Sequence, residues 1–304
     1  MLRALKINIF LIIFSMILNP VLAEDIPIIV ISPSQKAQSK STVGTSVTVF
    51  DQSKIEKSND FFLGDLMGSD TTSFNSFQSG GYGSASGIQL RGLPKRYSTV
   101  FIDGVKQSDP SSVSGDFDFS HILKNQISRA EVLKGNQSSV YGSGAIGGAI
   151  NIVTKRGQPG FQKNINYNTA SHGTHNLALS MSGADDKNDF YIGYERFVTD
   201  GISAMDNNDE EDAYRNNTIV ANYGYKFNDK LKIENNARVA QGYLQYDTLA
   251  DKAAYLAEDT DEQRQFELSG SASLIYKPSG QFTNRLIYST YNIDRIYNTY
   301  DDGQ

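Results

Sequence analysis

The stretch Ser139-Val-Tyr-Gly-Ser-Gly-Ala-Ile-Gly-Gly-Ala-Ile-Asn-Ile-Val-Thr154 decides how the rest of this chain is interpreted. Four glycines between Gly142 and Gly148 precede a largely β-branched run from Ile150 to Thr154. Glycines allow a sharp backbone turn, and β-branched residues favour extended backbone. The stretch therefore predicts a tight turn that feeds a strand.

The same glycines also contain the spacing G-x-G-x-x-G, through Gly142, Gly144 and Gly147. A dinucleotide site of that kind requires a helix directly after the glycines and an acidic residue about twenty positions on. Here a strand-forming run follows, and no Asp or Glu occurs between Gly148 and Ala184. We interpret the glycines as a crowded turn and not as a nucleotide site.

The first 23 residues predict a secretory signal peptide. Arg3 and Lys6 precede an apolar core from Ile7 to Leu18, and small residues end the segment at Ala23. The core is too short for a transmembrane anchor. We therefore expect a mature protein that begins at Glu24, outside the cytoplasm.

Composition narrows the class of protein further. The chain has 304 residues, no cysteine and a formal net charge of -6. The absence of cysteine rules out disulfides and thiolate metal sites, and the acidic balance argues against nucleic acid as a partner. After residue 23 no apolar run reaches the roughly 18 residues that a membrane helix needs.

Residues 24–44 contain a proline-interrupted apolar segment, Ile26-Pro27-Ile28-Ile29-Val30-Ile31. Pro27 and Pro33 oppose a helix and remove backbone donors from a central strand. The segment is expected to be an extended peptide that adds to the sheet edge of another protein. An ordinary N-terminal edge strand is the alternative.

Residues 45–157 mix strand and helix patterns. Residues 46–50 and 98–102 predict short strands, the second ending in the turn pair Asp103-Gly104. Residues 58–67 predict a short capped helix, with Asn59 and Asp60 at its start and Gly68 after its end. These elements indicate a compact α+β domain.

Residues 158–304 alternate apolar and polar side chains in segments of about ten residues, which is typical of tilted outer-membrane β-strands. In residues 218–227, for example, Ile219, Tyr223 and Phe227 share one face, and Asn222 and Lys226 share the other. A soluble β-sandwich also alternates, but its strands are shorter. We expect seven antiparallel strands, at about 162–171, 174–184, 188–199, 217–227, 230–241, 264–277 and 281–297. An open sheet cannot lie in lipid, so we expect the chain to be the N-terminal part of a longer protein.

No catalytic constellation stands out, and two charged features remain. Residues 206–212 contain five carboxylates, which suit Ca²⁺ although the glycine of an EF-hand loop is missing; a solvated surface loop is the alternative. Arg91 lies beside Gly92, and Arg129 and Glu131 share one face of a predicted strand at 127–133. Such charges would pair a plug reversibly with a barrel wall, or they would simply be exposed.

Four segments resemble the plug domain of TonB-dependent outer-membrane receptors. They are Ile88-Gln-Leu-Arg-Gly92, Val100-Phe-Ile-Asp-Gly-Val105, Ile127-Ser-Arg-Ala-Glu-Val-Leu-Lys-Gly135 and the block that ends at Thr154. The plug motif residues on these segments are Arg91, Gly92, Asp103, Gly104, Arg129, Glu131, Gly135, Tyr141, Gly142, Gly147 and Gly148. The resemblance implies a signal peptide at 1–23, a TonB box and linker at 24–44, an α+β plug at 45–157 and, at 158–304, the first transmembrane strands of a barrel of about 22 strands.

The resemblance also implies partners and ligands. The TonB box, which recruits the periplasmic energy-transducing protein TonB, would be Ile26, Pro27, Ile28, Ile29, Val30 and Ile31. External ligand would contact Tyr82, Ser84, Ser108, Asp109, Ser111 and Ser114. Residues 113–120 and the layout of the acidic loop are most similar to the cobalamin receptors of the family, which implies a calcium role for Asp206, Asp209 and Asp212.

The expected function is active import across the outer membrane of a Gram-negative bacterium, without enzymatic activity and without a covalent cofactor. The cargo expected from the resemblance is a small organometallic or chelate ligand, with cobalamin first and a ferric siderophore or haem as the alternative. A passive porin, or an outer-membrane adhesin or enzyme, is a more distant alternative.

Overall fold

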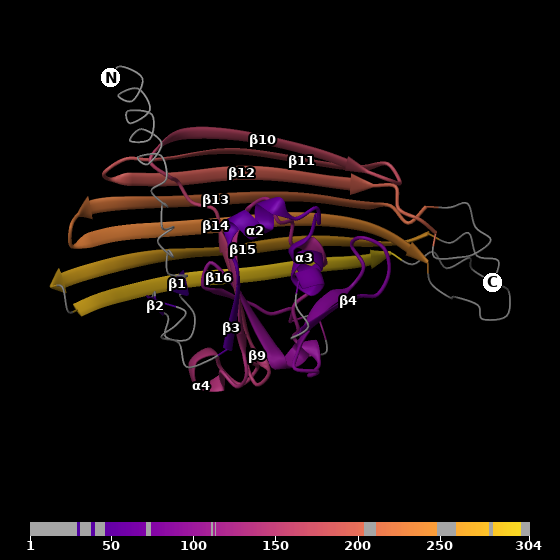
Figure 1. The fold of residues 1–304 in the computed structure, drawn as a ribbon, viewed down its shortest axis with the longest axis horizontal. Coiled ribbons are helices and arrows are strands. Elements are labelled where there is room, and N and C mark those ends of the chain that lie inside the picture. The colour runs from indigo at the N-terminus through magenta and orange to yellow at the C-terminus, as the bar shows by residue number, and fades with distance from the viewer. Residues whose placement is uncertain are drawn as a thin grey trace, which may run out of the picture.

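The computed structural model describes residues 29–30, 38–39, 46–70, 74–110, 112, 114–203, 211–247, 260–279 and 282–298. Residues 46–154 form a small α+β unit, here called the plug. It lies against one face of a large antiparallel sheet, here called the wall (Figure 1). N-terminal to the plug, Ile29–Val30 (β1) pairs with Gln38–Ser39 (β2). Within the described residues, no helix is long and apolar enough to cross a membrane.

The plug contains a five-stranded sheet in the order β3-β8-β9-β6-β7. Its strands are Ser46–Phe50 (β3), Ser98–Ile102 (β6), Val105–Gln107 (β7), Ile127–Lys134 (β8) and Gly148–Thr154 (β9). Strands β6 and β9 are parallel, and the other pairs are antiparallel. The predicted strands at 46–50 and 98–102 are confirmed. Phe74–Gln78 (β4) and Ser86–Leu90 (β5) form a separate hairpin ladder.

The plug helices are short and cover an apolar core. They are Gln52–Lys57 (α2), Leu63–Asp70 (α3), Lys95–Tyr97 (η2), Phe119–His121 (η3) and Ser138–Tyr141 (α4). Side chains from the sheet, α2 and α3, such as Phe50, Ile55, Leu63 and Ile150, are almost fully buried. Each such side chain contributes about 1.5–3 kcal/mol when it is removed from water.

The predicted helix at 58–67 is wrong in its bounds, because the chain forms two helices with a break between them. Asp51 caps α2 by accepting a hydrogen bond from the Lys54 backbone N–H at 2.9 Å. Ser58 and Asp60 then form a local side-chain turn, and Phe62 makes a β-bridge to Leu123. Local hydrogen bonds of Ser and Asp compete with helix formation, so α3 begins only at Leu63.

The glycine-rich stretch forms the turn that leads into β9. Gly142 follows α4 with φ of 88°, and Gly148 begins β9 with φ of 155°. A Cβ atom on Gly148 would lie 2.2 Å from the Leu133 carbonyl oxygen. The crowded turn and the following strand are therefore confirmed.

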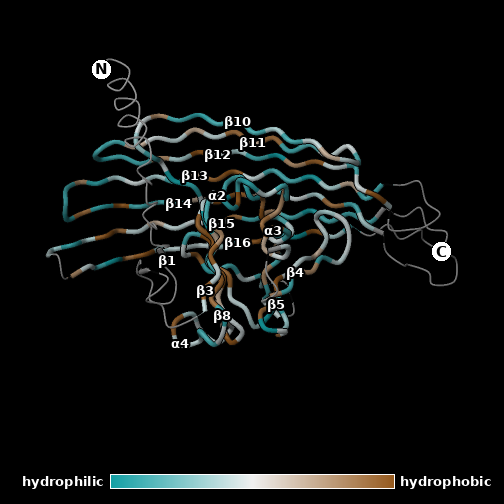
Figure 2. The backbone as a smooth tube through the Cα atoms, viewed as in Figure 1, coloured by the Kyte–Doolittle hydropathy of each residue, from teal (hydrophilic) through white to brown (hydrophobic). Residues whose placement is uncertain are grey.

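The wall consists of seven consecutive antiparallel strands, each paired with its neighbour in sequence. They are Gly160–Ala170 (β10), Thr174–Ala184 (β11), Asn188–Thr199 (β12), Tyr214–Asn228 (β13), Leu231–Asp247 (β14), Thr260–Ser279 (β15) and Phe282–Asn298 (β16). All seven predicted strands are confirmed, several with longer bounds. The hydropathy of the wall strands alternates along their length (Figure 2).

The two faces of the wall differ in character. On β13 the Asn222 side chain faces the plug and its residue is 2% exposed, whereas Ile219 on the opposite face is 48% exposed. Short turns at 185–187 and 229–230 join strands at one end of the wall, and the turn at 171–173 joins β10 to β11 at the other end. The chain also leaves that other end after β12 and after β14, where 14 and 12 residues of sequence precede the next strand. In outer-membrane barrels the short turns are periplasmic and the long loops are extracellular.

Candidate functional site: the contact between plug and wall

Residues 118–126 of the plug run along the wall, and backbone contacts inside the plug fix their course. The Asp118 carboxylate accepts hydrogen bonds from the backbone N–H groups of Ser86 and Ser120, both at 3.0 Å. The Leu63 N–H donates to the Ile122 carbonyl at 2.9 Å. These bonds turn His121 and the residues after it toward the wall.

His121 lies at the centre of a buried polar network between plug and wall. Its Nδ1 lies 2.8 Å from the Tyr214 hydroxyl on β13, and its carbonyl oxygen accepts from Arg238 Nη2 on β14 at 2.9 Å. Arg238 Nη1 also pairs with Glu267 on β15 at 2.6 Å. Plug and wall therefore share a continuous set of buried hydrogen bonds across three strands.

Tyr214, Asn216 and His121 form one buried polar cluster. The Tyr214 hydroxyl lies 3.2 Å from the Ser120 carbonyl oxygen and 2.8 Å from His121 Nδ1, and it accepts from Asn216 Nδ2 at 3.0 Å. Asn216 Nδ2 also lies 3.5 Å from His121 Nδ1. Burial lowers the pKa of His121 by disfavouring the charged form, so the imidazole is neutral at pH 7.

A second set of contacts joins the plug to β12. Asn125 Nδ2 donates to Glu195 Oε1 at 2.6 Å, and the Tyr191 hydroxyl donates to Gln126 Oε1 at 2.5 Å. Glu195 is fully buried, so its carboxylate depends on such donors for compensation. Asn176 on β11 supplies another donor, because its Nδ2 lies 3.0 Å from Glu195 Oε1.

Two wall glycines provide the space that these plug side chains occupy. A Cβ atom on Gly193 would lie 1.9 Å from Gln126 Oε1, and a Cβ atom on Gly242 would lie 2.4 Å from His121 Cε1. A larger residue at Gly242 would collide with the His121 ring, and one at Gly193 would force the Gln126 amide to move. The two glycines therefore leave room for these plug side chains.

Ion pairs and further hydrogen bonds join other parts of the plug to the wall. Asp109 Oδ2 lies 3.0 Å from Arg295 Nη1 on β16, and Arg156 Nη1 lies 3.4 Å from Asp189 Oδ1 on β12. Gln107 Nε2 donates to the Ser269 hydroxyl on β15 at 3.0 Å. The charges that pair with the wall thus include Asp109 of the plug and Arg156, which lies between the plug and β10.

Arg129 and Glu131, for which the sequence predicted pairing with a wall or simple exposure, pair with each other. Arg129 Nε lies 2.8 Å from Glu131 Oε1, and Glu131 is fully buried. The two residues share one face of β8, as the period of a strand requires. Their ion pair lies inside the plug.

The other plug motif residues shape turns of the plug. Arg91 and Gly92 have φ of 56° and 74°, and Asp103 and Gly104 have φ of 49° and 80°. The Asp103 carboxylate accepts from the Thr154 N–H at 3.0 Å and from its hydroxyl at 2.6 Å. Burial raises the pKa of Asp103, which these two hydrogen bonds partly offset. The turn thereby ties the β6–β7 hairpin to the end of β9.

The remaining motif glycines hold the segment between β8 and β9. The Gly135 N–H donates to the Gly147 carbonyl at 2.9 Å, and the Gly147 N–H donates to the Tyr97 carbonyl at 2.8 Å. Tyr141, at the end of α4, packs its ring centroid 5.2 Å from that of Phe101. These contacts place the glycine-rich stretch against β6.

The predicted ligand residues lie in two loops that contact different wall strands. Tyr82 packs its ring against Phe61, Phe62 and Phe197, in an aromatic cluster at the long-loop end of the wall. Ser84 closes the turn beside it through a backbone bond to Gly81. Ser108 Oγ donates to the Gly115 carbonyl at 3.1 Å, Asp109 pairs with Arg295, and Ser114 is exposed. Ser111 lies outside the described residues.

The predicted TonB box and calcium ligands fall mainly outside the described residues. Of the box, Ile29 and Val30 are described, paired with Ser39 and Gln38; Ile26, Pro27, Ile28 and Ile31 are not. Asp206 and Asp209 lie outside the described residues, and Asp212 precedes β13. Among the residues that are described, no three His, Asp or Glu side chains gather as metal ligands.

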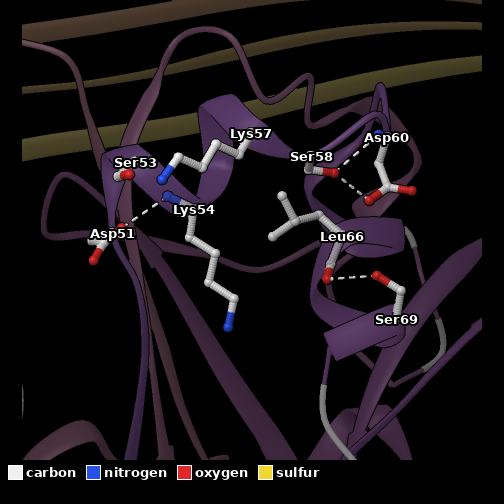
Figure 3. Close-up of a pocket in the computed structure, with 8 residues that line it drawn as sticks. All are labelled: Asp51, Ser53, Lys54, Lys57, Ser58, Asp60, Leu66 and Ser69. Atoms are coloured by element: carbon white, nitrogen blue, oxygen red, sulfur yellow. Dashed lines mark hydrogen bonds between the residues drawn. The ribbon is translucent and has the colours of Figure 1, made fainter.

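Two hollows lie next to the plug helices. One, of about 680 Å³, lies between the plug and β10–β12 and is lined by amide, hydroxyl and basic side chains, including Asn125, Gln126, Lys155 and Asn164. The other, of about 560 Å³, lies between α2 and α3, where Lys54 and Lys57 extend from one side and Asp60 and Leu66 lie on the other (Figure 3). The first is the one that touches the wall.

The family model described as TonB-dependent Receptor Plug Domain matches residues 39–149. The match covers the five-stranded sheet and its glycine-rich turn, and the wall follows directly in sequence. Residues 39–149 therefore form the plug domain of a TonB-dependent receptor. Such receptors are proteins of the Gram-negative outer membrane, and the apolar outer face of the wall fits that location.

Relatives of this receptor include a vitamin B12 transporter, BtuB, of Photobacterium profundum. It is 30% identical over 226 residues, which are 65% of this chain and 37% of the relative. The chain thus spans well under half the length of this curated relative.

Solved structures share the fold of this receptor at low sequence identity. The ferric yersiniabactin uptake receptor FyuA of Yersinia pestis superposes with a TM-score of 0.69 at 19% identity, over 84% of this chain and 42% of that chain. The ferripyoverdine receptor of Pseudomonas aeruginosa superposes with a TM-score of 0.70 at 12% identity, over 86% of this chain and 36% of that chain. These likenesses confirm a plug followed by barrel strands.

Sequence reasoning missed the residues that join plug and wall. His121, Asn125 and Gln126 lie between recognisable motifs, and nothing in their spacing marks them. On the wall, Glu195 and Tyr214 fall on the faces that alternation assigns to the lumen, so the direction of these side chains could be predicted. The plug residues that they contact could not be predicted from the sequence.

Proposed function

We propose that this chain provides the plug and the first wall strands of an active outer-membrane importer, and that it is not an enzyme. External ligand binds near Tyr82, Ser84 and the loop of Ser108, Asp109, Ser111 and Ser114. The periplasmic protein TonB then pulls on the segment Ile26–Ile31, after residues 1–23 have been removed as a signal peptide. Ligand binding alone supplies no net transport energy, so import depends on this coupling.

One observation supports this proposal beyond family membership. Much of the contact between plug and wall consists of hydrogen bonds and ion pairs, for example those of His121, Asn125 and Asp109. Water can replace such contacts when they open, whereas an apolar core resists opening. A plug held in this way can move without unfolding of the wall. The polar cavity between the plug and β10–β12 offers a place where a path can begin.

The TonB dependence is tested by deleting residues 24–35 from the full-length receptor. We expect ligand uptake to be lost while ligand binding at the cell surface is retained, because the deletion removes the coupling segment and leaves the plug and wall in place. Uptake and binding of radiolabelled ligand by whole cells measure the two separately. Unchanged uptake would identify a passive porin instead.

For the cargo we propose a cobalamin-like ligand, with a ferric siderophore or haem as the second candidate. The relative from Photobacterium profundum is a vitamin B12 transporter and supports the first candidate. The structures of a yersiniabactin and a pyoverdine receptor support the second, through the shared fold alone.

We also propose that Asp206, Asp209 and Asp212 bind Ca²⁺ and order the extracellular loop 200–213. Equilibrium binding of cobalamin and of a ferric siderophore to the full-length receptor, with Ca²⁺ or with a chelator, tests cargo and cation together. We expect cobalamin to bind at least tenfold more tightly with Ca²⁺, and the variant with Asp206, Asp209 and Asp212 changed to Asn to lose this difference. Equal affinity with and without Ca²⁺ would contradict the calcium role, whichever cargo binds.

A further inference from the structure

The plug residue Asn125 covers a wall glutamate that has donors on only one of its two oxygens. Glu195 lies on the inward face of β12 and is fully buried. Asn125 Nδ2 donates to Glu195 Oε1 at 2.6 Å, and Asn176 Nδ2 on β11 donates to the same oxygen at 3.0 Å. The second oxygen, Oε2, is buried and has no hydrogen-bond partner within the described residues.

A second buried acceptor without a donor lies on the neighbouring side chain. Asn176 is also fully buried, and its Oδ1 has no partner in the part of the chain that the structure describes. Glu195 and Asn176 are thus joined by one hydrogen bond, and each carries one further buried oxygen that lacks a donor. Buried polar atoms are almost always paired, because burial removes their hydrogen bonds to water.

The neighbouring hydroxyl groups already donate elsewhere. Thr218 on β13 is directly opposite Glu195 in the strand register, and its hydroxyl donates to Asn216 Oδ1 at 2.9 Å. The Tyr191 hydroxyl, on the same strand as Glu195, donates to Gln126 Oε1 at 2.5 Å. Neither hydroxyl proton is therefore left for Glu195 Oε2.

The neighbouring cations are also bonded to other groups. Lys124 of the plug and Lys155, which follows β9, are the lysines whose charge acts on Glu195. Lys124 Nζ donates to the Ser58 carbonyl, and Lys155 Nζ lies 3.0 Å from Glu56 Oε1 on α2. Glu195 thus has no counter-ion in direct contact among the described residues, and an ionised Glu195 would be a buried charge without a salt bridge.

A single proton supplies a donor for both unpaired oxygens. An ionised carboxyl group only accepts hydrogen bonds, whereas a protonated one also donates. A proton on Glu195 Oε2 can donate to Asn176 Oδ1 while Asn176 Nδ2 continues to donate to Glu195 Oε1. The acid and the amide then form a cyclic pair with two hydrogen bonds, and no charge is buried.

We propose that Glu195 is a proton-binding site at the contact between plug and wall. The side chain is a neutral carboxylic acid paired with Asn176 while Asn125 covers it, and it ionises when the contact opens and water reaches it. Because a buried charge costs more free energy than a hydrated one, the closed contact binds the proton more tightly than the open contact. The plug is therefore attached more weakly as the pH rises, whichever cargo is imported.

Infrared spectroscopy of the full-length receptor in detergent tests for the proton directly. We expect a carboxylic-acid C=O band at about pH 6 that shifts in D2O and is lost at about pH 9. The band should be missing from Glu195→Gln. Glu234→Gln is the matched control and should keep the band, because Glu234 is an inward carboxylate of β14 that pairs with Lys232 at 3.0 Å. Labelling with ¹³C-glutamate assigns the band to a glutamic acid.

Hydrogen exchange of the same proteins tests the effect of the proton on the plug. Glu195→Gln keeps both hydrogen bonds at every pH, because its amide N–H donates to Asn176 in place of the acid. We expect the amides of residues 121–126 to be equally protected in both proteins at about pH 6, and about threefold or more less protected in the unchanged receptor at about pH 9. Comparison at the same pH cancels the intrinsic effect of pH on exchange.

Three results would overturn the proposal. A receptor whose acid band does not depend on Glu195 would hold an ionised carboxylate there. An equal change of protection with pH in Glu195→Gln and the unchanged receptor would show that the proton does not control the contact. Protection that falls at constant pH when Na⁺ is replaced by choline would identify a bound cation between the two oxygens instead.

A variant that does not fold leaves the proposal testable. Heat-modifiable migration of the barrel reports folding of each variant. If Glu195→Gln fails this test, Glu195→Met, of similar size, takes its place in the infrared comparison. The ¹³C-shifted band and its loss between about pH 6 and pH 9 are then measured in the unchanged receptor, and absence of that band would contradict a protonated Glu195 without any variant.

Discussion

His121 keeps a neutral imidazole buried between the plug and the wall strands β13 and β14. Its Nδ1 bonds to Tyr214, its carbonyl bonds to Arg238, and the missing side chain of Gly242 leaves room for its ring. Charged groups around it are Asp118, which caps the N-terminus of η3, and Arg238, Glu267 and Arg295 on β14, β15 and β16. Burial lowers the pKa of His121 in spite of the two carboxylates.

This lowered pKa predicts a pH dependence of stability. An unfolded histidine titrates at about 6.5, so below that pH the unfolded chain binds a proton that the folded receptor resists. We expect the stability of the receptor to fall as the pH is lowered from 7.5 to 5, and His121→Gln to remove part of this fall. Thermal unfolding of full-length protein at several pH values measures it.

The control for this prediction is His175→Gln, which changes an exposed histidine of β11. Asp65 changes the pH dependence of stability in the direction opposite to His121. Burial raises the pKa of Asp65 to about 6, so the stability that this group contributes falls as the pH rises. The difference between variant and unchanged protein isolates His121. An identical pH profile for His121→Gln and the unchanged receptor would contradict the assignment.

At the scale of elements, the segment 121–126 is an anchor that joins the plug to β12, β13 and β14. Asn125 compensates the buried Glu195 carboxylate, and Gln126 fits into the space over Gly193. A buried carboxylate that loses a donor costs about 1–3 kcal/mol, more than the net value of the bond itself. Loss of this anchor should loosen the plug and leave the pairing of the wall strands unchanged.

We predict that Asn125→Ala speeds amide hydrogen exchange in the adjoining strand β8 by about tenfold or more, since about 1.4 kcal/mol of lost local stability corresponds to tenfold. Exchange in β13 and β14 should stay the same, because their hydrogen bonds lie within the wall. Asn75→Ala, at an exposed position on β4, is the matched control. Faster exchange in plug and wall alike would indicate general destabilisation and contradict a local anchor.

At the scale of the whole molecule, the receptor combines a continuous wall with a plug that is attached through polar contacts and through one apolar cluster, in which Phe61 and Phe62 pack against Phe197. The wall strands pair continuously with their sequence neighbours, so their stability is local to the sheet. The plug has its own apolar core, centred on residues such as Phe50 and Ile150, and so keeps its shape when wall contacts open. The deletion of residues 24–35 tests whether the plug can respond independently of the wall, because TonB would act on the plug alone.

The two faces of the wall differ in what they contact. Inward residues such as Glu195 bond to plug side chains, whereas outward residues such as Ile219 form an apolar band.

The sequence by itself determined the elements and the family. Alternation with period 2 predicted all seven wall strands and assigned Ile219 and Asn222 to opposite faces. The reason is that successive side chains of a barrel strand face lipid and lumen in turn. The turn pair Asp103-Gly104 and the glycine-rich stretch were also recognisable, since positive φ strongly favours these residues. The helix at 58–67 was misplaced, because the side-chain bonds of Ser58 and Asp60 and the bridge of Phe62 to Leu123 interrupt it.

Only the tertiary structure decided which plug residues meet which wall residues. His121 and Tyr214 are 93 positions apart, and Asn125 and Glu195 are 70 apart, so no local pattern links them. Their pairing follows from how the plug packs into the curve of the wall, where buried polar groups must find partners.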